Sequence, residues 1–332
     1  MTPPGRDARL GARLFSVALA MTVGMGGARA QSRVGAGDFD PVAVVNGITI
    51  PTSECAALEA AETAIRITVA GQGACLRYYA AGLRPAPGPN PIAALWLNGD
   101  VLGPHGNDAR RRQSGFGPSA MVAQVGQLAG RYGVPFIFLG RPGTYGSEGR
   151  HHTMRGRPIE AAWIDAALTA LKARYGIGAW ALGGHSGGGT LVAEMLARRD
   201  DLRCAVISSG AAAHRAYREA RGIMPAGAAM DRFDPYASLN RIPDDPARRI
   251  FVIGDPRETN VPFATQRLYY EGLVAHHHAA WLLPLERATD ARHHGLVDFG
   301  ETATGLCAAG AATQVILDTL EGMPEQPPRL TN

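Results

Sequence analysis

The stretch AWALGGHSGGGTLVAE, residues 179–194, decides how the chain folds. It opens with an apolar run typical of a buried strand, and its second half is typical of a helix, so a glycine-rich turn joins the two. Within that turn, Ser186 stands two residues from Gly184 and two from Gly188. A serine at a sharp strand-to-helix turn has a strained backbone, which requires neighbours without side chains, and its hydroxyl projects above the sheet. The stretch therefore predicts an exposed, reactive serine at the end of a strand.

On both sides of this turn, short apolar runs alternate with amphipathic stretches. The expected strands are Ile92–Leu97, Pro135–Leu139, Ala179–Leu182, Cys204–Ser208, Ile250–Ile253 and Ala280–Leu285. The expected helices lie near residues 118–131, 158–175, 187–199, 262–274 and 303–321. Alternation of this kind predicts an α/β fold with a mostly parallel sheet and helices on both of its faces.

The residues before this alternating region predict a smaller antiparallel piece. Ala64–Ala70 and Ala74–Ala80 are β-rich runs separated by Gly71, Gln72 and Gly73, which is a hairpin signal. We expect residues 31–91 to join the sheet of a catalytic domain spanning residues 92–325. Residues 211–249 show little periodicity and could form a small cap over the site.

Residues 1–30 have the layout of a secretory leader. Arginines 6, 9 and 13 precede the apolar run Leu14–Val23, and Ala28-Arg29-Ala30 has the small-x-small form of a cleavage site. The apolar run is shorter than the ~20 residues of a spanning helix, so we expect no stable membrane insertion once the leader is cut after Ala30. The sequence thus predicts a secreted or periplasmic protein.

The charge of the chain argues against polyanionic partners. The net charge is +4, and the leader holds four arginines against one aspartate, which leaves about +1 for the remainder. A nucleic acid or an anionic membrane would find no electrostatic support on such a chain. We expect a small molecule or a short peptide as substrate, and the sequence does not give the oligomeric state.

A reactive serine needs a base, and the base needs a carboxylate to orient it. Asp255 and Glu258 both follow the strand Ile250–Ile253, and either could be the acid. His293 and His294 follow the next strand, and we prefer His294 because the adjacent glycine lets the loop bring the ring over the serine. The order serine, acid, histidine is therefore met.

Acyl transfer also requires donors for a tetrahedral oxyanion. One expected donor is the backbone N–H of Gly187, and the other is the N–H of Asp100 or Gly99 in the loop after an early strand. Arg141 and Tyr145 follow another strand end and are expected at the rim of the same site. Arg141 could bind a substrate carboxylate or form a structural ion pair.

The four cysteines, Cys55, Cys75, Cys204 and Cys307, all follow the expected leader. An even number in an exported protein suggests disulfides, and four cysteines allow three pairings. Cys55 with Cys75 and Cys204 with Cys307 are the pairs considered, and buried free thiols remain the alternative. No C-x-x-C spacing accompanies histidines at ligand distances, so no metal site is expected.

Residues 92–300 resemble the catalytic domain of α/β hydrolases. The resemblance is to the prolyl-oligopeptidase-related and dienelactone-hydrolase-like branches, through Gly-His-Ser-Gly-Gly at 184–188, the segment Glu258–Pro262 and His-Gly at 294. It implies an eight-stranded, mostly parallel sheet and a Ser–acid–His triad, but not the substrate, because these branches include peptidases, esterases and lactonases. The segment departs from the family pattern in holding Glu at 258.

The expected function is hydrolysis of an ester, lactone or amide through an acyl-enzyme on Ser186. A peptidase acting on short peptides and a non-catalytic binding protein of the same fold are the alternatives, and acyl transfer to an acceptor other than water would use the same residues. Neither a phosphate-binding G-x-x-x-x-G-K-[ST] loop nor a dinucleotide fingerprint occurs in the sequence, and we expect no cofactor.

Overall fold

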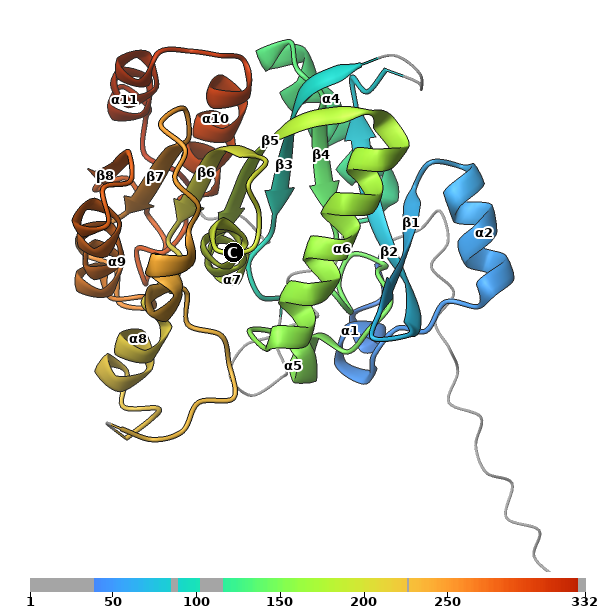
Figure 1. Ribbon diagram of the computed structural model, residues 1–332, viewed down its shortest axis with the longest axis horizontal. Coiled ribbons are helices and arrows are strands. Elements are labelled where there is room, and N and C mark those ends of the chain that lie inside the picture. Colours follow the sequence, from blue (N-terminus) through green and yellow to red (C-terminus); the bar gives the residue numbers. More distant parts are fainter. Residues whose placement is uncertain (1–38, 85–88, 102–115, 226, 328–332) are drawn as a thin grey trace, which may run out of the picture. The chain divides into compact units, whose positions relative to one another are not determined.

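The computed structural model describes residues 39–84, 89–101, 116–225 and 227–327, so the expected leader lies outside the described residues. The described strands form one eight-stranded sheet in the order β1-β2-β4-β3-β5-β6-β7-β8 (Figure 1). They are β1 (Ala64–Val69), β2 (Gln72–Ala81), β3 (Asn90–Leu97), β4 (Phe136–Leu139), β5 (Ile177–His185), β6 (Leu202–Ser208), β7 (Arg249–Gly254) and β8 (Ala280–Pro284). The expected hairpin is present as β1 and β2.

Across the sheet, every pair of neighbouring strands from β4 through β3, β5, β6 and β7 to β8 is parallel. Only β2 runs against its neighbours, pairing antiparallel with both β1 and β4. In the centre β3 pairs with β5, so that Leu95 lies opposite Leu182 and Leu97 lies opposite Gly184. Parallel pairing brings the carboxyl ends of these strands to one edge of the sheet, where ligands bind in open α/β sheets.

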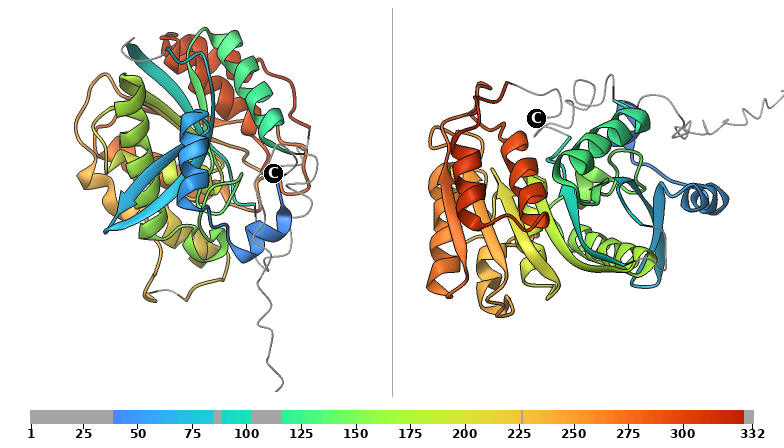
Figure 2. Two further views of the ribbon diagram at one scale, coloured as in Figure 1. Left: turned by 90° about the vertical axis from the view of Figure 1, so that its right-hand side faces the viewer. Right: turned by 90° about the horizontal axis from the view of Figure 1, so that it is seen from above.

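Helices cover both faces of the sheet (Figure 2). The side chains of α6, α7 and α9 share one core with the sheet, and those of α4, α10 and α11 share the other. The described helices are α1 (Pro41–Asn46), α2 (Thr52–Ala60), α4 (Pro118–Tyr132), α5 (His151–Met154), α6 (Pro158–Tyr175), α7 (Gly187–Leu196), α8 (His214–Ala220), the 3-10 helix η1 (Pro235–Arg241), α9 (Phe263–Ala275), α10 (Val297–Ala308) and α11 (Thr313–Glu321).

Local sequence explains where α6 begins and ends, but one expected helix was wrong. Helix α6 begins at Pro158 and ends before Gly176, whose φ of 60° is left-handed. The single helix expected near 303–321 is two helices, α10 and α11. Gly310 between them has a φ of 79°, a conformation that a continuing helix does not allow.

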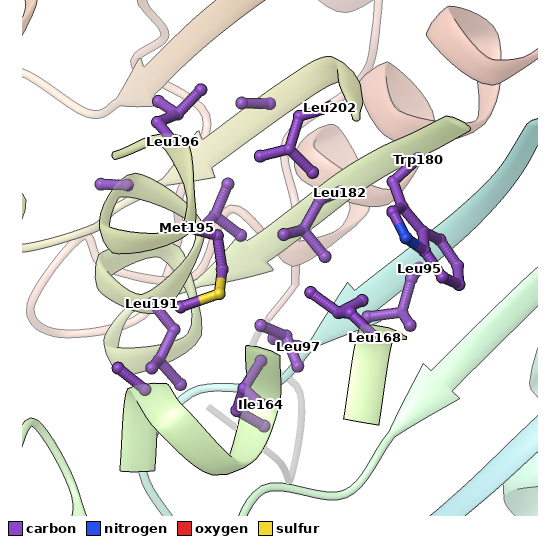
Figure 3. Close-up of a cluster of buried hydrophobic side chains, with 14 of the residues drawn as sticks. Leu95, Leu97, Ile164, Leu168, Trp180, Leu182, Leu191, Met195, Leu196 and Leu202 are labelled. Carbon is purple, nitrogen blue, oxygen red and sulfur yellow. The ribbon is translucent and has the colours of Figure 1, made fainter. Parts of the chain in front are cut away.

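The core beneath the central strands is built from large aliphatic side chains (Figure 3). Leu95 and Leu97 of β3 point to the same face as Leu182 of β5, and they meet Leu168 of α6 and Leu191 of α7. All five side chains are fully buried. Truncating one such leucine to alanine costs about 2–5 kcal/mol, so this packing fixes β3 and β5 rigidly beside each other.

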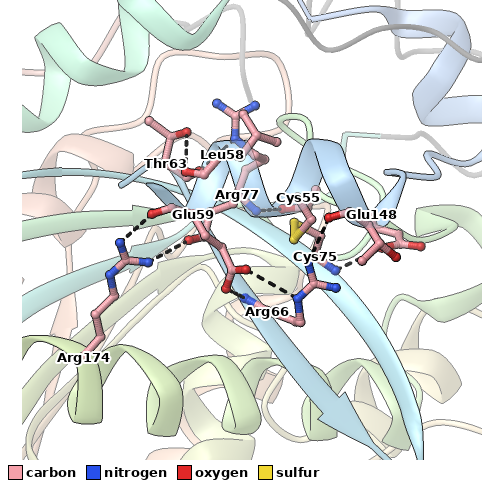
Figure 4. Close-up of a disulfide and its surroundings, with 12 residues drawn as sticks. Cys55, Leu58, Glu59, Thr63, Arg66, Cys75, Arg77, Glu148 and Arg174 are labelled. Atoms are coloured by element: carbon pink, nitrogen blue, oxygen red, sulfur yellow. Dashed lines mark hydrogen bonds and ion pairs between the residues drawn. A yellow bond between two sulfur atoms is a disulfide. The ribbon is translucent and has the colours of Figure 1, made fainter. Parts of the chain in front are cut away.

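Two disulfides brace the fold, and they are the two pairs considered from the sequence. Cys55 of α2 binds Cys75 of β2 with a Cα–Cα distance of 6.0 Å (Figure 4). Cys204 of β6 binds Cys307 of α10 with a Cα–Cα distance of 6.3 Å. Because these bonds close loops of 20 and 103 residues, chain entropy gives the second the larger effect, about 4–5 kcal/mol against about 3.

Residues 211–249 run from the carboxyl end of β6 back to the amino end of β7 and contain α8 and η1 (Figure 1). Arg221, directly after α8, donates a hydrogen bond to the Thr259 carbonyl oxygen in the loop after β7. Phe233 donates its N–H to the Gly156 carbonyl oxygen, 3.0 Å away, in the loop before α6. The segment is therefore tied to two separate loops. In the described part of the chain, no helix has the length and apolarity to cross a membrane.

Candidate active site

Ser186 lies where β5 ends and α7 begins, in a backbone conformation that few residues adopt. Its φ is 54° and its ψ is −122°. A non-glycine residue in such a region costs on the order of 1–3 kcal/mol and persists only where the surroundings enforce it. Here its N–H donates to the Ser208 carbonyl oxygen at 2.8 Å, and its own carbonyl accepts from the Thr190 N–H at 2.9 Å. The strand-to-helix turn expected from the sequence is present.

Steric crowding explains why the two positions that flank Ser186, 184 and 188, are glycines. A Cβ at Gly184 would stand 2.6 Å from the Gly188 carbonyl oxygen, on the other side of the turn. A Cβ at Gly188 would overlap the carbonyl oxygens of Leu97 and Asn98, at the end of β3. Only a residue without a side chain lets α7 start this close to the neighbouring strand.

The loop after β7 brings Glu258 to His294. The Oε1 atom of Glu258 contacts Nδ1 of His294, and both side chains are buried. Oε1 also accepts the Val261 N–H at 2.9 Å, and Oε2 accepts from the Gln266 amide at 2.9 Å. Both carboxylate oxygens are thus held in place, and Nε2 of the imidazole is left for another partner.

Asp255, the other acid considered, is occupied elsewhere. Its carboxylate forms an ion pair with Arg257 at 2.7 Å and accepts the Ala288 N–H at 3.2 Å. Burial raises the pKa of Asp255, but its hydrogen bonds with Arg257 and Ala288 outweigh this and hold the pKa below its ordinary value. Asp255 fastens the loop after β8 to the end of β7 and does not meet His294.

The loop carrying the two histidines is shaped by Asp290. Its Oδ2 atom accepts the N–H groups of His294 and Gly295 at 2.9 and 2.7 Å. His293 has a φ of 51°, and its Nδ1 lies 3.0 Å from the Ala288 carbonyl oxygen. The backbone of His293 has a positive φ, the ring of His293 lies at the Ala288 carbonyl, and it is the ring of His294 that reaches Glu258.

His185 connects the serine turn to the histidine loop. Its Nε2 lies 2.8 Å from the His294 carbonyl oxygen, and the two rings have centroids 4.6 Å apart. Because His185 precedes Ser186 in the chain, this contact positions His294 against the serine turn. The sequence shows that His185 is next to Ser186 in the chain, but it gives no signal for this hydrogen bond.

The loop after β3 packs against Ser186 from the opposite side. A Cβ at Gly99 would be 3.1 Å from the Ser186 Cβ and 3.2 Å from Nδ1 of His185. Gly187 is the first residue of α7, and the Asp100 carboxylate stands against its Cα. The three residues expected to supply oxyanion donors therefore surround the serine, at the positive end of a helix.

Arg141 does not lie at an exposed rim. Only 2% of its side chain is exposed, and its guanidinium bridges Asp100 at 2.8 Å and Glu160 at 2.9 Å. Burial raises the pKa of Asp100, but Arg141, Arg155 and His151 together hold the pKa of this carboxyl well below its ordinary range. Arg141 is a structural ion pair that fixes the side chain of Asp100, which corrects the expectation of a rim residue.

Tyr145 is buried as well, which again differs from the expected rim. Its side chain is 1% exposed, and its hydroxyl accepts a hydrogen bond from the Asn98 amide at 2.6 Å. Asn98 in turn accepts from the Trp96 indole at 3.1 Å. Tyr145 therefore supports the loop after β3 through its hydrogen bond to Asn98, and its ring packs against Phe39 and Phe138.

Within the described residues, no group of three or more His, Cys, Asp or Glu side chains is placed to hold a metal ion. The site therefore consists of a strained serine, a histidine joined to a buried glutamate, and backbone N–H groups beside the serine. Chemically, such a set can accept a proton from a hydroxyl and stabilise an oxyanion.

The chain was compared with known proteins by sequence and by structure. No protein-family model and no curated protein sequence matches the chain. A puromycin-hydrolyzing peptidase of Mycobacterium tuberculosis is 17% identical with a TM-score of 0.50, over 79% of this chain and 40% of that one. Acylaminoacyl peptidase of Pyrococcus horikoshii is 10% identical with a TM-score of 0.49, over 79% of this chain and 41% of that one. An esterase of Pyrococcus furiosus is 15% identical with a TM-score of 0.48, over 76% and 89%.

At these identities the likeness concerns the fold. The eight-stranded sheet with its one reversed internal strand, together with the structural neighbours, shows that the chain has the α/β-hydrolase fold. The expected fold class, a mostly parallel sheet covered by helices on both faces, is confirmed.

The steric argument for the turn predicts the effect of a single methyl group. Gly188→Ala should lower the free energy of unfolding by at least about 2 kcal/mol, because the new Cβ overlaps the carbonyl oxygens that end β3. Chemical denaturation of both proteins measures the change.

Gly130→Ala is the matched control. Gly130 lies inside α4, and a Cβ there would meet no atom within 4 Å. Replacing an open helical glycine by alanine stabilises by about 0.5–1 kcal/mol. A Gly188→Ala protein as stable as the wild type would mean that the turn does not need glycine at this position.

Proposed function

We propose that the protein is a serine hydrolase that cleaves a carboxylic ester, lactone or amide through an acyl-enzyme on Ser186. The observation that carries the proposal is the contact between Glu258 and His294, joined through His185 to the turn that holds Ser186. A buried carboxylate on Nδ1 of a histidine, beside a serine with strained backbone, is the arrangement that activates a hydroxyl.

In the proposed mechanism, His294 accepts the proton of Ser186 at Nε2 while the serine Oγ attacks the substrate carbonyl carbon. Glu258, bound at Nδ1, stabilises the imidazolium that forms. The N–H of Gly187 and the N–H of Gly99 or Asp100 would bind the oxyanion. The imidazolium then gives its proton to the leaving alcohol or amine, and the carbon–oxygen or carbon–nitrogen bond breaks.

The second half of the cycle uses the same residues. Water loses a proton to His294 and adds to the acyl carbon, and Ser186 leaves with that proton as the acid product forms. An acceptor other than water would give acyl transfer instead, and product analysis with added alcohols or amines separates the two. We favour carboxylic esters and lactones. Peptidases occur among the structural neighbours, and amide bonds of short peptides are the alternative substrate class.

We also propose that the protein is exported and then loses its leader after Ala30. The layout of residues 1–30 and the two disulfides support this, because disulfides persist in oxidising compartments. Residues 211–249 are proposed to cap the site, since they are tied to loops on two sides of it.

Export predicts a mature chain that begins at Gln31. N-terminal sequencing of the protein from a periplasmic fraction should read from this residue, and non-reducing peptide mapping should recover Cys55 with Cys75 and Cys204 with Cys307. An intact N-terminus together with four free thiols would argue against export.

Replacing the nucleophile tests the function itself. Ser186→Ala should lower kcat for any good ester substrate by at least roughly a thousandfold, because only binding and oxyanion stabilisation remain. The same change should abolish labelling by a fluorophosphonate probe, while circular dichroism shows an unchanged fold. Retention of more than about a tenth of the activity would exclude Ser186 as the nucleophile and with it the mechanism.

The acid and the base can be tested against their neighbours in the chain. Glu258→Gln and His294→Ala should each lower kcat by about a hundredfold or more, since His294 carries the proton and Glu258 orients its ring and stabilises the imidazolium. Asp255→Asn and His293→Ala are the matched controls, because their side chains bind Arg257 and the Ala288 carbonyl instead. The controls should keep kcat within a few-fold, and equal losses in both sets would leave the assignment without support.

A further inference from the structure

A cluster of arginines lies beside the candidate oxyanion site and is not used by the proposed mechanism. It consists of Arg155 after α5, Arg218 of α8 and Arg232 in the segment after α8. Arg155 reaches Oδ2 of Asp100 at 3.2 Å, and the other oxygen of that carboxylate stands against Gly187. The arginine cluster therefore borders the residue that directly follows the serine.

The guanidiniums of the arginine cluster lie close enough to repel one another. Asp100 and Glu160 are both engaged by the buried Arg141, and Arg155 also contacts Asp100. Arg232 donates to the Arg155 carbonyl oxygen, a neutral group, and the nearby Asp231 pairs with Arg157 at 2.7 Å. Burial lowers the pKa of Arg232, and Arg155 and Arg218 lower it further by repulsion. An anion placed between these guanidiniums would relieve that repulsion.

Arg218 is the member with an unused hydrogen-bond donor. The side chain is half-buried, and its buried Nε atom meets no hydrogen-bond partner among the described residues. A buried N–H group without an acceptor is costly, because its desolvation is not offset. The position would be stabilised by an incoming anion.

Two imidazoles lie in the same region. His214 lies one turn before Arg218 on α8, and Nε2 of the buried His151 lies 3.7 Å from Oδ1 of Asp100. Burial and neighbouring arginines lower the pKa of His214 to about 4 and that of His151 to about 3. Each ring is neutral at pH 7 and can donate one N–H to a ligand oxygen.

We propose that Arg218, with Arg155, Arg232 and His214, forms a subsite for a carboxylate carried by the substrate. A planar guanidinium matches the two oxygens of a carboxylate, which makes arginine the residue suited to this recognition. The inference rests on the proposed hydrolase function and narrows its substrate to acids that are also esters or amides, such as half-esters of dicarboxylic acids. The carboxylate binds while the reacting carbonyl lies at Ser186.

Two esters with the same leaving group test the subsite. The wild-type kcat/KM for 4-nitrophenyl hydrogen glutarate should exceed that for 4-nitrophenyl pentanoate by at least about tenfold, and added salt should reduce the ratio. In Arg218→Gln this ratio should fall about tenfold or more. Arg215→Gln removes the same charge from the same helix, where Arg215 pairs with Glu219 at 3.8 Å, and should leave the ratio unchanged.

The ratio separates recognition from a merely structural role, because a disturbed fold would lower both values of kcat/KM together. If Arg218→Gln does not fold, Arg218→Lys replaces it: the charge remains but the planar fork is lost, so part of the preference should remain. A ratio near one in the wild type, or an unchanged ratio in both Arg218 variants, overturns the subsite while the hydrolase function stands.

Binding without turnover keeps the two proposals distinguishable. Calorimetry should detect glutarate bound to the Ser186→Ala protein, and adding Arg218→Gln to it should weaken that binding about tenfold or more. If no ester is hydrolysed but glutarate binds through Arg218, the proposed function fails and the carboxylate site remains. If glutarate binding is absent or indifferent to Arg218, the subsite is wrong.

Discussion

The close approach of α7 to the end of β3 is the constraint on which the site depends. Gly188 has no room for a side chain beside the carbonyl oxygens of Leu97 and Asn98, and this contact sets where the helix begins. Ser186 must therefore turn through a left-handed backbone conformation to join β5 to α7. The strain at one residue is offset by the packing of two strands and a helix, which is why the serine is held rigidly above the sheet.

The alternation of strands and helices was readable because it depends on local periodicity. The turn at Ser186 was readable for the same reason, since the glycines that permit it lie two residues away. Where tertiary contacts determine which side chains meet, the sequence allowed more than one candidate residue. Asp255 and Glu258 stand three residues apart on one loop, and only the positions of Arg257 and Gln266 determine which carboxylate reaches His294.

The same limit explains the expectations that were wrong. Arg141 and Tyr145 follow a strand end, which predicts exposure near a site, but Glu160 of α6 and Asn98 after β3 draw both side chains inward. The Asp290 carboxylate that shapes the histidine loop gave no signal in the sequence, because an aspartate in a polar loop is the ordinary case. The end of α10 at Gly310 could have been read from that glycine alone.

The Cys204–Cys307 disulfide has a consequence for how the protein opens as well as for how stable it is. The 103-residue segment it closes contains the loop of Glu258, the loop of His294 and the segment 211–249. Partial unfolding normally begins at mobile edges and spreads through cooperative units, and detached segments become substrates for proteases. A cross-link from β6 to α10 keeps both loops tethered to the sheet even when β7 and β8 come apart. The half of the molecule that holds Glu258 and His294 can therefore return to its native arrangement without a search through a large number of extended conformations.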